Sequence, residues 1–110
     1  MDVNIKSYKR VDVVKVAGRV DSNSAPELEK MLQQLWEAGR NQIVLDLEDV
    51  DYLSSAGLRV MVSTLKAVKR SNGDVRLAAN SVRVSEVMQL AGLNSIFQSY
   101  PTQIDAVGSF

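Results

Sequence analysis

Apolar residues recur along this chain with two different periods, one typical of strands and one typical of helices. Residues 42–47 form a short and mostly continuous apolar run, which is typical of a strand buried on both faces. From residue 55 to about residue 70, apolar side chains recur at three- and four-residue steps, which predicts an amphipathic helix. The same helical spacing precedes Gly39 and Gly92, and both glycines are well placed to end helices.

Shorter segments predict the remaining elements. Residues 3–7 and 11–17 are rich in Val and Ile and predict an N-terminal hairpin with charged residues at its turn. Residues 75–79 predict a further strand, and Ile96 and Phe97 a short last strand.

Loops and helix starts follow from polar residues. Residues 18–24 and the acidic stretch 48–53 are predicted to be loops. Ser24 and Glu27 have the spacing of a capping box at the start of the first helix. The last helix is predicted to begin at Pro101–Thr102, where Thr102 and Asp105 have capping-box spacing, with Ile104 and Val107 pointing inward.

Strands that alternate with helices indicate an α/β fold with right-handed crossovers. We expect a mostly parallel sheet of about four to five strands, with an N-terminal antiparallel hairpin strand, packed with about four helices. A length of 110 residues suits one compact core, so residues 1–110 are expected to form a single domain.

Composition narrows the function. Thirteen basic and 13 acidic side chains cancel without long runs of either sign, which argues against binding to nucleic acid or to a membrane surface. The chain contains no Cys and no His, so disulfides, usual zinc sites and Ser-His-Asp or Cys-His catalysis are excluded, and no metal, cofactor or enzymatic activity is expected. The N-terminus has no basic leader or long apolar segment, so we expect a cytoplasmic protein.

The predicted junction between the central strand and the long helix carries the most informative polar residues. Its sequence is Ser54-Ser55-Ala56-Gly57, so a serine lies at the helix N-terminus. Such a serine can cap the helix by accepting from an unpaired backbone N–H. It can also hold a phosphoryl group, because the N-terminus of a helix carries partial positive charge. The spacing alone leaves both readings open.

The junction resembles the signature of the STAS family, the module of bacterial anti-sigma-factor antagonists and of the cytoplasmic tails of sulfate transporters. The matching stretch is Asp51-Tyr52-Leu53-Ser54-Ser55-Ala56-Gly57-Leu58. In the antagonists this loop usually reads Asp-Ser-Ser-Gly-Leu or Asp-Ser-Ala-Gly-Leu, and the first serine is the phosphoacceptor. The resemblance places that acceptor at Ser55, with Ser54, Ala56 and Gly57 beside it. Ser54 stands where the family has Asp, which removes a charge next to the acceptor.

A second stretch, residues 18–24, resembles the family's Gly-x-Leu-Asp or Gly-x-Ile-Asp followed by small polar residues, with Asp21 as the acid. The resemblance implies that Asp21 lies near the phosphoacceptor and takes part in kinase recognition or phosphoryl transfer. Asp21 could equally be a turn residue that bonds its own backbone.

The resemblance covers nearly the whole chain and implies a partner-switching regulator. Unphosphorylated, it would bind an anti-sigma factor that is also a serine kinase. Phosphorylation at Ser55 would release it, and a serine phosphatase would restore it. We expect a monomer that pairs transiently with its partner. The expected partner-binding residues are Asp21, Ser22, Asn23, Asp51, Arg59, Ser63 and Lys66, although the basic helix face could equally be ordinary solvated surface.

Two other readings stay open. A receiver-type phosphoacceptor or small phosphatase could use Asp46 at the end of the central strand, but a receiver needs two acids after its first strand and a Lys after its last. The chain has Ala17-Gly18 and no suitable Lys after Phe97. The second reading keeps the STAS fold as a constitutive adaptor or a small-ligand module, and Ser54 in place of Asp favours it.

Overall fold

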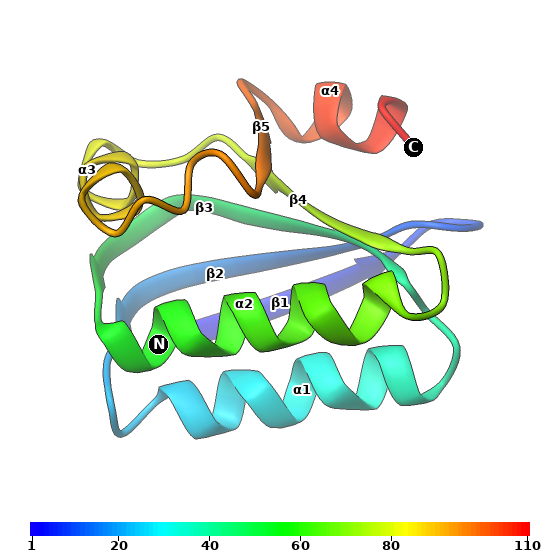
Figure 1. Cartoon of the computed structure of the whole chain (residues 1–110), viewed down its shortest axis with the longest axis horizontal. Coiled ribbons are helices and arrows are strands. Elements are labelled where there is room, and N and C mark those ends of the chain that lie inside the picture. The colour runs from blue at the N-terminus through cyan, green and yellow to red at the C-terminus, as the bar shows by residue number, and fades with distance from the viewer.

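The computed structural model describes residues 1–110 as a five-stranded sheet with four helices (Figure 1). The strands are β1 (Asp2–Ser7), β2 (Asp12–Val20), β3 (Gln42–Leu53), β4 (Asp74–Ala78) and β5 (Gln98–Tyr100). The helices are α1 (Ala25–Glu37), α2 (Ser55–Lys69), α3 (Val82–Leu90) and α4 (Gln103–Gly108). None of these helices combines the length and hydrophobicity needed to cross a lipid bilayer.

The sheet has the strand order β1-β2-β3-β4-β5. The β1–β2 pair is antiparallel and the other three pairs are parallel, which confirms the predicted α/β fold class with its N-terminal hairpin strand. Helices α1 and α2 lie side by side against one face, and α4 lies on the other (Figure 1). Figure 1 also shows that the start of α2 and the β1–β2 turn lie at opposite ends of the molecule.

The main core lies between the sheet and the α1–α2 layer. Alternate side chains of β2 and β3 enter it, and the inner stripes of both helices meet them, as the helical periodicity predicts. Its members include Val14, Val16, Ile43, Leu45, Leu28, Leu32, Met61, Leu65 and Val68, all buried. A smaller cluster on the opposite face joins Val13, Val44 and Ala78 to Ala106 of α4.

Two central strands are longer than predicted. Residues 48–53, predicted as an acidic loop, continue β3, and residues 18–20 continue β2. The reason is that Val50 and Leu53 are buried in the core, while the neighbouring residues Glu48, Asp49, Asp51 and Tyr52 stay exposed. Register shifts in β2 between Lys15 and Ala17, and between Gly18 and Arg19, accommodate this irregular spacing.

Three predictions about individual helices and strands are wrong. Ser24 makes no side-chain bond to the first turn of α1, so the capping box is absent there. The last strand comprises residues 98–100 instead of Ile96–Phe97, because Phe97 is buried in the core just before the strand starts. Ile104 points outward, because the small Ala106 is the residue of α4 that packs closely on the sheet.

Candidate functional site

Strand β3 passes into α2 through Ser54, and the two serines of this junction have different roles. Ser54 is the N-cap of α2, with φ −84° and ψ 170°, and its Oγ accepts from the Gly57 N–H at 3.3 Å. Ser55 is the first residue of the helix. Its side chain is exposed, and its hydroxyl makes no hydrogen bond. Ser54 therefore does the capping, which leaves the Ser55 hydroxyl accessible.

The first turn of α2 packs directly against the ends of both long strands. Gly57 is buried, and a Cβ atom at this position would lie 2.7 Å from Leu53 Cδ1 and 2.8 Å from Val20 Cγ1. Only glycine permits this close approach. The position of Ser55 relative to the sheet is thus set by Gly57, two residues away.

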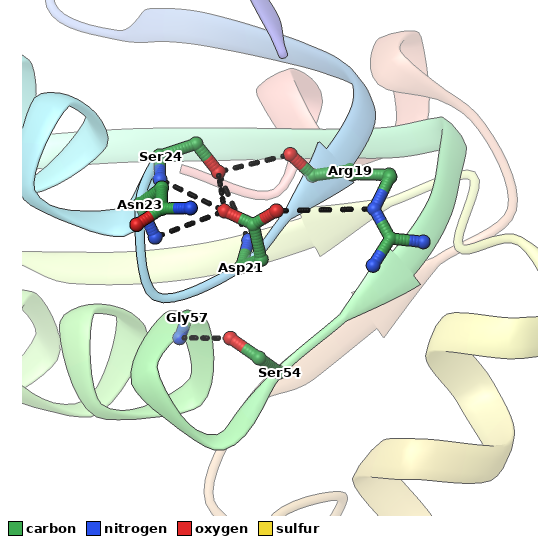
Figure 2. Close-up of polar contacts among 6 residues, drawn as sticks. All are labelled: Arg19, Asp21, Asn23, Ser24, Ser54 and Gly57. Carbon is green, nitrogen blue, oxygen red and sulfur yellow. Dashed lines mark hydrogen bonds and ion pairs between the residues drawn. The ribbon is translucent and has the colours of Figure 1, made fainter.

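The loop between β2 and α1 is organised by Asp21 (Figure 2). Asp21 Oδ1 accepts from the backbone N–H groups of Asn23 and Ser24, both at 3.0 Å. Ser24 Oγ accepts from the Asp21 N–H at 2.9 Å and donates to the Arg19 carbonyl at 3.0 Å. Asp21 is therefore a turn residue that bonds its own backbone, and the Ser24 hydroxyl serves this loop instead of capping α1.

These contacts lower the pKa of Asp21. The main cause is the hydrogen bond from the Ser24 backbone N–H, and the Asn23 N–H adds to it, because both stabilise the charged form. The Arg19 guanidinium, 3.8 Å from Asp21 Oδ2, acts in the same direction. Arg19 also stacks on Tyr52 of β3, with 4.2 Å between the guanidinium carbon and the ring centroid. Asp21 thus carries a negative charge at neutral pH, on the loop next to the serine junction.

One backbone hydrogen bond joins the two loops. The Ser54 N–H donates to the Val20 carbonyl at 2.9 Å. Asp21 and Ser55 each directly follow a member of this bonded pair, so both loops emerge from the same end of the sheet. Ser22 lines a small hollow of about 190 Å³ together with Ala56 and Arg59, which brings the two loops to one surface.

Ser55 opens onto a groove of about 350 Å³ that runs along α2. Three of the residues predicted to bind a partner line it, together with three apolar side chains that the sequence reading did not assign to a site. The lining comprises Ser55, Arg59, Ser63, Lys66, Leu58, Val62 and Leu93. Leu58 and Val62 fall within the helical apolar spacing predicted from residue 55 onward. No local signal marked Leu93, which comes from the segment after α3.

Arg59 and Lys66 are exposed on this groove, and neither forms an ion pair. They give one wall of the groove two uncompensated positive charges beside apolar surface. Asp51, by contrast, is an exposed residue of β3 that makes no side-chain hydrogen bond or ion pair and does not line the groove. The structure thus gathers most of the expected partner-binding residues but leaves Asp51 apart.

Asp46, the residue of the receiver-type alternative, lies within β3 and not at its end. Its side chain is only 2% exposed. Its carboxylate accepts from the Glu48 N–H at 3.1 Å and from the Gln103 amide, and Lys15 Nζ lies 3.8 Å away. Asp46, with Asp49, raises the pKa of Lys15. The structure contains no group of three or more acidic side chains arranged to hold a metal ion. Asp46 therefore acts as a buried link between β3, β2 and α4.

A family model described as the STAS domain matches residues 2–106. The chain belongs to the STAS family. A curated relative, the anti-sigma-B factor antagonist of Staphylococcus aureus, is 34% identical over 98 residues, covering 87% of this chain and 91% of the relative. The corresponding protein of Staphylococcus epidermidis is 31% identical over the same length. Both names describe regulators and not enzymes.

Solved structures agree with this assignment. The crystal structure of an anti-sigma factor antagonist from Mycobacterium paratuberculosis superposes with a TM-score of 0.89 at 28% identity, covering 98% of this STAS chain and 92% of that chain. The phosphorylated form of the Bacillus cell fate determinant SpoIIAA shares the fold alone, with a TM-score of 0.79 at 16% identity. The predicted family and fold are therefore confirmed.

Proposed function

We propose that this STAS protein is an anti-sigma-factor antagonist whose binding is switched by phosphorylation of Ser55. Unphosphorylated, it binds an anti-sigma factor that is also a serine kinase, and so frees the sigma factor. The kinase transfers the γ-phosphoryl group of ATP to Ser55 Oγ, which releases ADP and the hydroxyl proton. A serine phosphatase later hydrolyses the phosphoester and restores binding.

One observation carries this proposal: the free Ser55 hydroxyl shares a groove with two uncompensated cations and an apolar floor. Arg59, Ser63 and Lys66 line that groove with Ser55. A partner that covers the groove must also cover Ser55. Any charge added to that hydroxyl then enters the interface directly.

The fold can accept a phosphoryl group at this position. The start of α2 leaves backbone N–H groups without helical acceptors, and the partial positive charge there stabilises an anion by about 0.3–1 kcal/mol at an exposed site. Arg59 lies four residues after Ser55, at the spacing of a helical ion pair. A phosphoryl group would therefore draw Arg59 away from a partner without unfolding the helix.

The affinity for the partner should fall strongly on phosphorylation. A phosphoryl group adds about −1.5 to −2 charge. Burying it against a surface that was complementary to Arg59 and Lys66 costs several kcal/mol through repulsion and desolvation. A loss of about 4 kcal/mol weakens binding roughly a thousandfold. That is sufficient for a switch between bound and released states.

Serine at position 54 is compatible with this switch. The family's Asp and the Ser found here are about equally good N-cap residues. Ser54 does accept from the Gly57 N–H, so the substitution keeps the geometry of the helix start and removes only a charge. We expect a kinase that recognises this chain to rely less on an acid beside the acceptor and more on the Asp21 loop, where Asp21, Ser22 and Asn23 lie at the protein surface.

We propose that residues 1–110 act as a single domain, as a monomer in the cytoplasm. The decisive experiment is calorimetric titration of the cognate anti-sigma factor with Ser55 variants of this chain. Ser55→Ala should bind as wild type does, and Ser55→Asp should bind at least about a hundredfold more weakly. Ser7→Asp, at the opposite end of the molecule, is the matched control and should bind normally. Equal binding of Ser55→Asp and wild type would refute the electrostatic switch.

A second measurement identifies the modified residue. Intact mass and peptide mapping of the protein from growing and stressed cells should find one phosphoryl group on Ser55 whose occupancy changes. Phosphate on Ser54 alone would reject the assigned acceptor. An unmodified chain in every condition would favour the alternative, a STAS adaptor or small-ligand module that signals without phosphorylation.

A further inference from the structure

A second groove, of about 320 Å³, lies between the β1–β2 turn and α4. Its lining comprises Tyr8, Gln103, Ile104, Val107 and Gly108. Ile104 is 83% exposed and Tyr8 is 42% exposed, which is unusual for large apolar side chains so close together. This volume is at the small end of ligand sites and suits one or two apolar side chains.

The turn that carries Tyr8 is held firmly. Arg40 Nε donates to Asp12 Oδ2 at 2.8 Å and Nη2 donates to Asp12 Oδ1 at 3.2 Å, which is the two-point geometry typical of arginine and carboxylate. The same guanidinium donates to the carbonyls of Tyr8 at 2.7 Å and Lys9 at 3.2 Å. Tyr8 also donates its N–H to the Val11 carbonyl. The groove wall is therefore preorganised, which reduces the entropic cost of binding.

The Tyr8 end of this groove is positively charged. Lys6 pairs with Val13 in the β1–β2 register, and Val13 packs with Ala106 of α4, so Lys6 lies on the α4 face. Its Nζ lies 5.6 Å from the centroid of the Tyr8 ring.

Lys9 and Arg10 follow Tyr8 in the exposed turn, and neither they nor Lys6 form an ion pair. Asp105 is the one acidic residue of α4. Because the Arg40 charge is already matched by Asp12, the three unmatched cations leave the Tyr8 end of the groove positive, whereas Asp46 and Glu48 lie beside Gln103 and Ile104 at its other end.

We infer that this Tyr8–α4 groove docks a short acidic peptide segment of a partner protein, with an apolar side chain in the groove and carboxylates against Lys6, Lys9 and Arg10. A concave site lined by the apolar side chains of Tyr8, Ile104 and Val107 suits one inserted side chain, whereas a lipid surface would be met by a convex patch. Opposite charges would also speed association and select against basic segments.

This inference goes beyond the proposed switch. The Tyr8–α4 groove and Ser55 lie at opposite ends of the sheet, as Figure 1 shows from the β1–β2 turn and the start of α2. A peptide here would leave the Ser55 groove free for the anti-sigma factor. The protein could then hold two partners at once, one of them independent of phosphorylation.

The test is a selection of random-sequence peptides, displayed on phage, against the immobilised full chain. Selected peptides should combine Asp or Glu with Leu, Phe or Trp. The triple variant Lys6→Glu, Lys9→Glu, Arg10→Glu should weaken their binding at least about tenfold, and Ile104→Ser should do the same. Lys30→Glu, an exposed charge reversal on α1, is the matched control and should change binding less than about twofold, as should Ser55→Asp.

Several results would overturn the inference. These are selection of no peptide, selection of peptides without acids, and equal binding to the triple variant or to Ile104→Ser. Binding of the chain to vesicles of equal phosphatidylserine and phosphatidylcholine, with no peptide selected, would replace the peptide by an anionic membrane. If the triple variant fails to fold, Ile104→Ser decides, together with the NMR shift changes that a selected peptide should cause at Tyr8 and Gly108.

Discussion

The backbone N–H of Ser54 donates a 2.9 Å hydrogen bond to the carbonyl oxygen of Val20. Through this bond the end of β2 and the start of α2 form one unit, although 34 positions separate the two residues in the sequence (54 − 20 = 34). The Asp21 loop and Ser55 continue from its two sides. A disturbance on either side of the bond should therefore reach the other.

The different roles of Ser54 and Ser55 can be tested by measuring the free energy of unfolding of their variants. Ser54→Ala should lower the free energy of unfolding by about 1 kcal/mol, because the Gly57 N–H loses its acceptor, while Ser54→Asp should be nearly neutral. Ser55→Ala should change it by less than about 0.5 kcal/mol, because the Ser55 hydroxyl has no partner. Urea unfolding measures all three. An equal loss at Ser55 would show that the cap is wrongly assigned.

Gly57→Ala should destabilise the protein despite the higher helix propensity of alanine. The added Cβ would meet Leu53 Cδ1 at 2.7 Å and Val20 Cγ1 at 2.8 Å, and both side chains are buried in a packed core. We expect a net loss of about 1–2 kcal/mol in the free energy of unfolding, after the gain in propensity is subtracted.

Gly108→Ala is the matched control, because a Cβ there meets nothing within 4 Å. In thermal unfolding, the melting temperature of this control should equal that of wild type or lie slightly above it. If Gly57→Ala were as stable as Gly108→Ala, the close packing of α2 against β2 and β3 would not constrain the junction.

Much of this fold could be predicted from the spacing of apolar residues alone. The stripes of α1, α2 and α3 are regular, and burial follows them. The extension of β3 could not be predicted in this way. Val50 and Leu53 are three residues apart in an irregular strand, and the acidic residues Glu48, Asp49 and Asp51 lie next to them. The burial of Val50 and Leu53 overrides the low strand propensity of Glu and Asp.

The candidate site was predictable in part for a similar reason. A serine at a strand–helix junction can be read from neighbouring residues, and Ser55 lies at the start of α2 as predicted. The role of Leu93 could not be predicted, because this residue reaches the Ser55 groove only where the segment after α3 packs against α2. Likewise, the pairing of Ser24 with Asp21 instead of with α1 depends on the local geometry of the turn, where two hydrogen-bonding patterns compete for one hydroxyl.

The Asp12–Arg40 pair should be important for stability. Asp12 is buried, and Arg40→Ala would leave its carboxylate without a counter-charge. Since the Arg40 side chain is 32% exposed and water can partly replace it, we expect a loss in the free energy of unfolding that is smaller than the roughly 3–5 kcal/mol of a fully buried pair. Arg40→Lys should lose less, because it keeps the charge but not the two-point geometry.

Urea unfolding at low salt gives these values, because urea does not screen charges as guanidinium chloride does. Arg83→Ala, which removes an exposed arginine without an ion pair, should change stability by less than about 0.5 kcal/mol. A loss at Arg40→Ala no larger than that of the control would mean that Asp12 is adequately solvated in the folded state.

Asp21 should make stability depend on pH in the acid range. Its folded pKa lies below the ordinary value of 3.8, mainly through the Ser24 N–H and next through the Asn23 N–H. A depressed folded pKa stabilises the protein above the unfolded pKa, and this contribution is lost as pH falls through the folded pKa. Wild type should therefore be more stable than Asp21→Asn at neutral pH, and the difference should shrink below about pH 4.

Two measurements check this dependence. NMR titration of the Asp21 carboxyl carbon should give a midpoint below that of an unstructured aspartate, and urea unfolding of wild type and Asp21→Asn across the acid range should converge. Asp51→Asn, at an exposed carboxylate without hydrogen bonds, is the control and should run parallel to wild type. A midpoint at or above 3.8 for Asp21 would show that the N–H groups of Asn23 and Ser24 do not hold the carboxylate in solution, and the Asp21 loop would then lack the fixed negative charge proposed for kinase recognition.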